Sequence, residues 1–274
     1  MIKKRLIFTL LYSNDFFCQS RNFDLQEVGD INWLKKNYNF KNISFYIDEL
    51  IVLDISREKK DKKKFIENVR QISELCFVPI TVGGGIKSLE DAKYFLTNGS
   101  DKILVNTEFL KNYEVINDIS STFGEQSIII GIDLKKDNKD YYVYSDNGQN
   151  KIKKTPKDIF KEISELRFGE IFLNSITKDG TGTGLDYEIL SLLPDNFKKP
   201  IILSGGTGNF NHIYETLKKT DVDAISTSNL LNFVGDGLIK TRNKLLEKDI
   251  PFPKWDMLEI KKLEASFGNR KNNL

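Results

Sequence analysis

Two glycine-rich turns have the residue types and the spacing to bind an anion. The first is Gly83-Gly84-Gly85, directly after the apolar run Val78–Val82, and the second is Gly205-Gly206, directly after Lys199–Ser204. At the end of a buried strand, glycines allow a sharp turn and leave backbone N–H groups able to bind an anion, most often a phosphate. For either turn alone, a tight turn without a ligand is an equally good interpretation.

The strand, the turn and the elements after them occur twice in the chain. Each turn precedes a predicted helix and then a short strand that begins at an aspartate, Asp101–Thr107 in the first copy and Asp223–Asn229 in the second. The repeat predicts two phosphate sites that face one cavity, which suits a ligand with a phosphate at each end. A duplication that kept the turns only for folding is the alternative. With the glycine-rich loop Lys178–Gly184 included, the candidate phosphate-binding residues are Gly84, Gly85, Asn106, Thr107, Asp179, Gly180, Gly205, Gly206, Ser228 and Asn229.

Composition narrows the classes of function. A chain of 274 residues fits one barrel domain or two smaller domains. Charged residues make up 29% and the net charge is +2, so there is no general signal for nucleic acid or membrane binding. We interpret the lysine-rich run Arg57–Lys64 as a solvated helix face.

Cysteine and histidine usage narrows these classes further. Cys18 and Cys76 are too few for a disulfide framework, and the sequence has neither an 18-residue apolar window nor a signal-peptide pattern. These features indicate a cytoplasmic protein. The single histidine, His212, nearly excludes a histidine-based triad or a multi-histidine metal site, and we interpret it as structural. We expect no metal and no cofactor.

Apolar strands alternate with amphipathic helices along the chain. Besides the two strands that lead into the glycine turns and the strand from Asp223, we predict strands at Arg5–Leu11, Glu49–Asp54, Lys102–Asn106, Ser127–Asp133 and Glu170–Asn174. Predicted helices span Ile31–Tyr38, Lys62–Leu75, Ser88–Asn98, Tyr113–Phe123, Pro156–Arg167 and Val234–Lys248. This order predicts an α/β fold, a (β/α)8 TIM barrel with an internal half-barrel duplication. We expect residues 1–250 to form one domain and residues 251–274 a C-terminal tail.

Two segments depart from this alternation. Tyr12–Asp30 has no clean period, and we predict a long loop there. Asn147-Gly148 lies between the alternating segments Tyr141–Tyr144 and Ile152–Lys154, which predicts a β-hairpin inserted after the fifth strand.

A set of short motifs is spread over Lys4–Pro251. They are Asp48-Glu49-Leu50 with Leu53-Asp54-Ile55, Val82–Ile86, Asp101-Lys102 with Asn106-Thr107, Ile132-Asp133, Asp179-Gly180-Thr181, Ser204-Gly205-Gly206 and Asp223-Ala224. On these motifs the chain resembles the HisA/HisF family of barrels, and most of all the cyclase subunits of imidazole glycerol phosphate synthase. The resemblance implies that a HisH-like glutaminase docks on the N-terminal face of the barrel and that ammonia passes through the barrel interior.

The resemblance also implies a ring of charged residues that gates ammonia at the bottom of the barrel. The matching residues, each at or beside a strand start, are Arg5, Glu49, Lys102 and Glu170. Two cations and two anions can pair with little net charge, which makes burial tolerable. Ordinary surface charges at strand ends are the alternative. Asp101 and Gln126 match positions that contact the glutaminase in the family.

The predicted catalytic site departs from the family. The family has a catalytic aspartate at the end of the first strand, where this chain has Leu11, whereas the second catalytic carboxylate is present as Asp133. Leucine cannot transfer a proton, and such a group typically contributes about 10²–10⁴-fold to a rate. In addition, Gln19 replaces a loop lysine and Asn229 replaces a serine.

A chain that retains the charged gate but lacks the first catalytic aspartate is similar to the HisF-like proteins associated with glycosyl amidation in surface-polysaccharide gene clusters. In these systems ammonia passes to an ATP-dependent amidotransferase that converts a sugar acetamido group into an acetamidino group. This is our leading hypothesis, with the glutaminase, the amidotransferase and a small phosphorylated ligand as expected partners. One alternative is a true cyclase in histidine biosynthesis, in which Asp15 replaces the missing acid. The other is a non-catalytic scaffold that binds a sugar phosphate.

Overall fold

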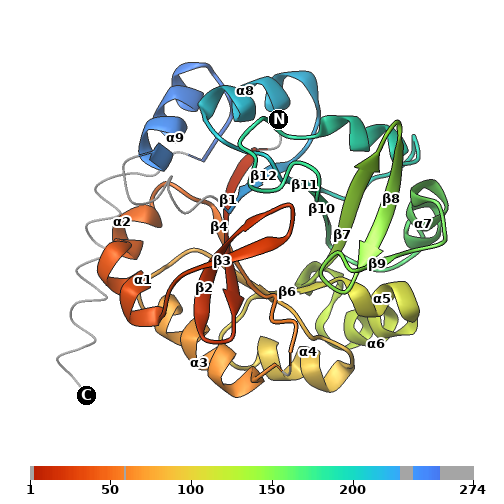
Figure 1. The fold of residues 1–274 in the computed structure, drawn as a ribbon, viewed down its shortest axis with the longest axis horizontal. Coiled ribbons are helices and arrows are strands. Elements are labelled where there is room, and N and C mark those ends of the chain that lie inside the picture. Colours follow the sequence, from red (N-terminus) through yellow and green to blue (C-terminus); the bar gives the residue numbers. More distant parts are fainter. Residues whose placement is uncertain (1–2, 59, 229–236, 254–274) are drawn as a thin grey trace.

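Eight short apolar segments pair in parallel and close into a barrel (Figure 1). The computed structural model describes residues 3–58, 60–228 and 237–253. In the order in which they pair, the barrel strands are β1 (Arg5–Ser13), β4 (Glu49–Asp54), β5 (Ile80–Gly83), β6 (Lys102–Val105), β7 (Ile128–Asp137), β10 (Glu170–Ser175), β11 (Ile201–Ser204) and β12 (Ala224–Thr227). The ring closes because β12 pairs with β1 and β10 pairs with β7. The predicted (β/α)8 TIM barrel is confirmed.

Helices lie around the outside of the barrel in Figure 1. They are α1 (Ile31–Asn37), α2 (Phe40–Ile43), α3 (Lys62–Ser73), α4 (Leu89–Leu96), α5 (Thr107–Lys111), α6 (Glu114–Phe123), α7 (Pro156–Ile163), α8 (Phe210–Lys219) and α9 (Gly237–Glu247), with 3₁₀ helices η1 (Glu125–Ser127) and η2 (Tyr187–Leu192). Helix α3 shows why they pack there, since Phe65, Val69 and Ile72 recur at helical spacing and are buried. No helix in the described ranges has both the length and the apolar character needed to cross a membrane.

Alternate residues of each barrel strand point to opposite sides of the sheet. On β1, Leu6, Phe8 and Leu10 belong to the large core between the strands and the helices. Ile7 instead belongs to a second, smaller core inside the barrel. The members of this inner core come from seven strands and are Ile7, Ile51, Leu104, Ile129, Phe172, Ile202 and Ala224. The barrel interior therefore contains an apolar layer at mid-height.

The internal duplication is visible in matching backbone contacts. The carboxylate of Asp101 accepts a hydrogen bond from the Ile80 backbone N–H at 2.8 Å, and the carboxylate of Asp223 accepts one from the Ile201 N–H at the same distance. Each of these aspartates ties the start of one strand to the start of the strand before it. Equivalent strand starts in the two halves of the barrel therefore share this contact.

The segment Tyr12–Asp30 is not the long loop that the sequence predicts. Strand β1 continues to Ser13, and β2 (Phe16–Arg21) and β3 (Asp24–Gly29) form an antiparallel hairpin that pairs with the end of β1. Pairing with β1 stabilises strands whose own sequence has no clean alternation. The insertion after the fifth barrel strand is a hairpin as predicted, formed by β8 (Asp140–Ser145) and β9 (Asn150–Lys151).

The end of the described chain lies against the start of the barrel. The Lys4 backbone N–H donates to the Pro251 carbonyl at 2.9 Å. Residues 254–274, most of the predicted tail, lie outside the described residues, so the predicted division into a domain and a tail stays a prediction.

A buried ion pair fixes α9 to the barrel. The Arg242 guanidinium is 2% exposed and donates to both carboxylate oxygens of Asp48, at 2.9 and 3.0 Å. We expect Arg242→Met to lower the free energy of unfolding by about 3 kcal/mol, because it leaves the Asp48 carboxylate buried without its cation. Urea denaturation measures the change. The control Lys244→Met, at an exposed position of the same helix, should change it by less than about 0.5 kcal/mol; equal effects of the two substitutions would contradict the assignment.

Candidate functional site

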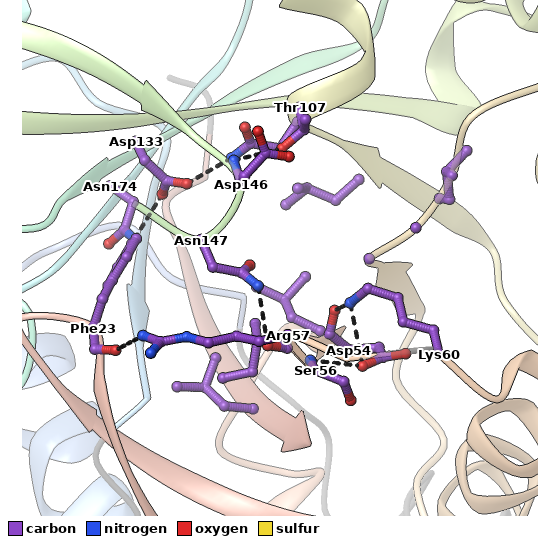
Figure 2. Close-up of a pocket in the computed structure, with 18 of the residues that line it drawn as sticks. Phe23, Asp54, Ser56, Arg57, Lys60, Thr107, Asp133, Asp146, Asn147 and Asn174 are labelled. Carbon is purple, nitrogen blue, oxygen red and sulfur yellow. Dashed lines mark hydrogen bonds and ion pairs between the residues drawn. The ribbon is translucent and has the colours of Figure 1, made fainter. Parts of the chain in front are cut away.

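A cavity of about 560 Å³ opens at the carboxyl ends of the barrel strands (Figure 2). Ligand sites in TIM barrels lie at this face because the loops that follow the strands gather there. The strand ends that contribute inward-facing residues to the cavity wall supply Leu11, Leu53, Asn106, Asp133, Asn174, Ser204 and Ser228. The cavity therefore lies directly above the apolar inner core.

Asp133 is the central carboxylate of this cavity. It accepts hydrogen bonds from the side-chain amides of Asn106, at 2.7 Å, and Asn174, at 3.0 Å. Burial raises its pKa from the ordinary value of 3.8 to about 6, although the two amides oppose the change. The nearby Asp179 carboxylate adds to the increase. A carboxyl group with this pKa exchanges protons near neutral pH, as a general acid or base must.

Leu11 occupies the equivalent place on β1. It lines the cavity with 9% of its surface exposed and pairs across the sheet with Leu53. In the other half of the barrel the equivalent pair is Asp133 with Asn174. One half of the cavity floor thus carries a carboxylate with its amide donor, and the other half carries two leucines.

Asp15, the candidate substitute for the missing acid, and Gln19, which replaces a loop lysine of the family, lie outside the cavity wall. Asp15 accepts from the Tyr12 hydroxyl at 2.8 Å and forms an ion pair with Lys64. Gln19 lies on β2, opposite Gln26 of β3. Neither is among the described residues that line the cavity, so the structure does not place Asp15 where it can replace a carboxylate at Leu11.

The first glycine turn opens onto the cavity. Gly84, Gly85, Asn106 and Thr107 all line it. Gly84 and Gly85 have φ of +104° and +74°, which is backbone that favours glycine. The Thr107 hydroxyl oxygen accepts from the Asp146 backbone N–H at 2.9 Å, so the β8–β9 turn also contacts this side of the cavity.

The second glycine turn is placed differently. Asp179 and Ser228 line the cavity, but Gly180, Gly205 and Gly206 are not among the described residues that do. Gly180 packs on the β2–β3 hairpin, where an added Cβ would lie 2.0 Å from the Ser20 carbonyl oxygen. Asn229 lies outside the described residues. Among the described residues, only the first turn contributes its glycines to the cavity wall, and the predicted second phosphate turn stays a prediction.

Asp179 has a structural partner that the sequence did not indicate. Its carboxylate accepts hydrogen bonds from the Ser20 hydroxyl and, at 3.1 Å, from the Phe23 backbone N–H. Burial raises its pKa, against the effect of these two donors. Asp179 therefore holds the β2–β3 hairpin over the cavity.

The interpretation of Arg57–Lys64 as a solvated helix face is wrong for its first part. Arg57, Glu58, Lys60 and Lys62 line the cavity, whereas Lys64 does not and is exposed. Their place in the sequence could have predicted this, because they directly follow the strand that ends at Asp54 and the loops at that end form the functional face of a barrel.

At the opposite end of the barrel, Arg5, Glu49, Lys102 and Glu170 converge and form four ion pairs. Arg5 pairs with Glu49 and Glu170, and the Lys102 ammonium lies 3.2 Å from Glu49 Oε2 and 2.6 Å from Glu170 Oε1. Burial opposes the charge on Glu170, but its contacts with Arg5 and Lys102 outweigh that effect and lower its pKa. Asp101 and Gln126 are exposed beside the strand starts at this same end.

Comparison with known proteins identifies the family of the chain. Residues 24–233 match the family described as "Histidine biosynthesis protein". The chain belongs to the HisA/HisF family. It is 45% identical over 273 residues to "Putative imidazole glycerol phosphate synthase subunit hisF2" of Parasynechococcus marenigrum, covering 99% of this chain and 100% of that protein. It is also 35% identical over 254 residues to the imidazole glycerol phosphate synthase subunit HisF of Sulfurisphaera tokodaii, and 34% identical over 251 residues to that of Chlorobaculum parvum. Each match covers 91% of this chain and 98% of the relative.

The raised pKa of Asp133 predicts that the stability of this HisF-like barrel depends on pH. The folded state binds the proton more tightly than the unfolded state, so the contribution of Asp133 to stability falls as pH rises from about 4 to 6 and stays reduced above that. The free energy of unfolding of Asp133→Asn, measured relative to that of the parent protein, should increase by about 2 kcal/mol between pH 4 and pH 7.5. The comparison uses urea denaturation at both pH values. Asp137→Asn, an exposed carboxylate on the same strand, is the control; the same pH dependence in both variants would refute the prediction.

Proposed function

We propose that this chain is the ammonia-receiving subunit of a glutamine-dependent enzyme, with a HisH-like glutaminase docked on the face that carries Arg5 and Lys102. The observation that carries the proposal is the convergence of the four charged side chains at the N-terminal mouth of the barrel. Desolvating four charges is costly, and only mutual pairing makes it tolerable. A barrel that only bound a ligand at its other end has no use for such a ring.

The interior above the ring suits a small neutral molecule better than an ion. The apolar inner core that contains Ile7 and Phe172 follows the ring, and then the Thr9 and Ser226 hydroxyl groups, 2.6 Å apart. An ion that enters the apolar layer loses its hydration without replacement, whereas ammonia loses much less. This order of layers supports the passage of ammonia and the exclusion of ammonium. In this role Asp101 and Gln126 contact the glutaminase.

The names of the relatives favour one acceptor for the ammonia. They are subunits of imidazole glycerol phosphate synthase, and Asp133 retains the properties of a general acid or base. At the level of the family, the supported function is therefore that of a HisF-like cyclase subunit, a lyase of histidine biosynthesis.

The replacement at Leu11 favours a second acceptor. With two leucines where the opposite half has Asp133 and Asn174, the floor has one proton-transfer group instead of two. In this candidate function the ammonia passes to an ATP-dependent amidotransferase that forms an acetamidino sugar for surface polysaccharide. Asp133 then contacts the ligand in the cavity without completing a cyclase pair.

An activity assay of the isolated protein distinguishes these two functions. Supplied with the histidine-pathway ribonucleotide and ammonium salt, it should turn over about 10²–10⁴-fold more slowly than a HisF cyclase measured in parallel, because one of the two acid–base groups is absent. Formation of the imidazole product is the readout. A rate within tenfold of the HisF control would establish the cyclase and exclude the amidation role.

The ring is tested in the complete complex with glutaminase and acceptor. Lys102→Ala removes a cation that holds both Glu49 and Glu170, so glutamine hydrolysis should continue while transfer of the amide nitrogen to product falls several-fold. Nitrogen-15 from glutamine amide is followed into product, and added ammonium salt should restore product formation in part. Lys199→Ala, next to β11 at the same end of the barrel but paired with Glu125, is the control. Unchanged transfer in the Lys102 variant would remove the basis for the gate.

A further inference from the structure

The cavity reaches down to the top of the apolar inner core. Thr9, Leu104, Phe172 and Ser204 all line it, and Leu104 and Phe172 also belong to the inner core. Side chains of a strand alternate in direction, so Thr9 is the inward residue of β1 directly below Leu11. We call these four lining residues the base of the cavity. A molecule that passes up through the inner core therefore meets two apolar side chains and two hydroxyl groups there.

One of these hydroxyl groups is half of a buried pair. The Thr9 and Ser226 hydroxyl oxygens lie 2.6 Å apart, and the two residues are 1% and 0% exposed. They come from β1 and β12, the neighbouring strands on which Ser226 lies beside Ile7. Among the described residues, neither hydroxyl group has a second hydrogen-bond partner. Each hydroxyl has one donor and two acceptor sites, so the pair retains one O–H donor and three acceptor sites for a further molecule.

The hydrogen-bonding groups that the pair retains are complementary to ammonia. The free O–H can donate to the nitrogen lone pair, and a hydroxyl oxygen can accept from an N–H group. Ammonium has no lone pair and needs acceptors for four N–H groups, which Leu104 and Phe172 cannot supply on their side of the base. Water has donors and acceptors of the same kind as ammonia, so a labelled nitrogen is needed to distinguish the two molecules.

A row of polar side chains leads from this pair to the central carboxylate of the cavity. It consists of one inward residue from each of five neighbouring strands, which are Thr9, Ser226, Ser204, Asn174 and Asp133. The strand register places Ser204 beside Asn174 and Asn174 beside Asp133. The Asn174 amide donates to Asp133 at 3.0 Å, as Figure 2 shows. A molecule that leaves the pair therefore has hydrogen-bonding partners in the direction of Asp133.

We propose that the Thr9–Ser226 hydroxyl pair binds one ammonia molecule as it leaves the apolar inner core and directs it along the polar row toward Asp133. The inference rests on the proposed function, the receipt of ammonia at the ion-pair ring, and adds a positioning site between that ring and the cavity. The two hydroxyl groups act only through hydrogen bonds and form no covalent bond with the ammonia. They replace part of the hydration that ammonia loses in the apolar layer.

Nitrogen-15 transfer in the complete complex tests the pair. The complex contains this chain, the glutaminase and the acceptor that the activity assay identifies. The double variant Thr9→Val with Ser226→Ala removes both hydroxyl groups, so neither is left buried without its partner. Incorporation of glutamine amide nitrogen into product should fall about five- to tenfold, the effect of losing one neutral hydrogen bond, while glutamine hydrolysis continues. Thr9→Ser keeps the hydroxyl group and should retain incorporation within about twofold of the parent.

Two controls separate passage of ammonia from damage to the barrel. Thr216→Val with Ser120→Ala removes two hydroxyl groups from residues that are each 2% exposed but donate to helix carbonyl groups, and it should leave incorporation within about twofold of the parent. Ammonium salt supplied in place of glutamine enters from the open side of the cavity and need not pass the hydroxyl pair. Product formation from ammonium should therefore fall less than about twofold in the Thr9 and Ser226 double variant.

The outcomes distinguish this inference from the proposed function. Parental incorporation of the labelled nitrogen in the Thr9 and Ser226 double variant would overturn the inference and leave the proposed function standing. An equal loss with ammonium salt, or in the Thr216 and Ser120 control, would overturn it as well, because the effect would then reflect damage to the fold or the cavity. If the parent complex itself incorporates no glutamine nitrogen, the proposed function fails, and that result appears without any substitution.

Discussion

The structure depends on one geometric constraint, the two-residue period of strands in a closed parallel barrel. Every second residue must enter the interior, and all strands begin at one mouth and end at the other. The inward residues of β6 accordingly run from Lys102 through Leu104 to Asn106, and those of β10 from Glu170 through Phe172 to Asn174. The ion-pair ring, the apolar layer and the ligand cavity are three levels of the same set of strands.

Buried charges are stabilised in different ways at the two ends of the barrel. At the N-terminal mouth, each of the four charged groups is paired with two groups of opposite sign, and this pairing favours the ionised carboxylate of Glu170. At the cavity, Asp133 has amide donors but no cation, so burial dominates and its pKa rises. The first arrangement holds charges fixed, whereas the second produces a group that gains and loses a proton near neutral pH. Both follow from which inward position the charge occupies.

Duplication provided a symmetric frame on which the halves have diverged. The matching contacts of Asp101 and Asp223 keep the strand starts in register in both halves. The cavity floor, by contrast, has Leu11 in one half and Asp133 in the other, and its lining cations lie in the first half of the chain among the described residues. The frame tolerates this divergence because strand pairing uses the backbone, whereas the inward side chains at the strand ends face the cavity and are not needed for closure.

Local sequence alone determined the elements of this barrel and several of its site residues. Glu49–Asp54 has the predicted bounds, and Ser88 caps α4 through the Asp91 N–H. Leu11 and Asp133 line the cavity, although their strands continue past the predicted ends, to Ser13 and Asp137. These features depend on residues close together in the chain, where periodicity and capping act.

Tertiary structure decided which of the candidate residues share the cavity. The β2–β3 hairpin is held by Asp179, about 160 residues further along the chain, and its position over Gly180 could not be read from either segment. Arg57 resembles the solvated lysines near it in sequence, and its hydrogen bond to the Phe23 carbonyl, in the distant β2–β3 turn, holds it at the cavity. Contacts of this kind join segments whose separation in sequence carries no periodic signal, so their energies appear only once the barrel has closed.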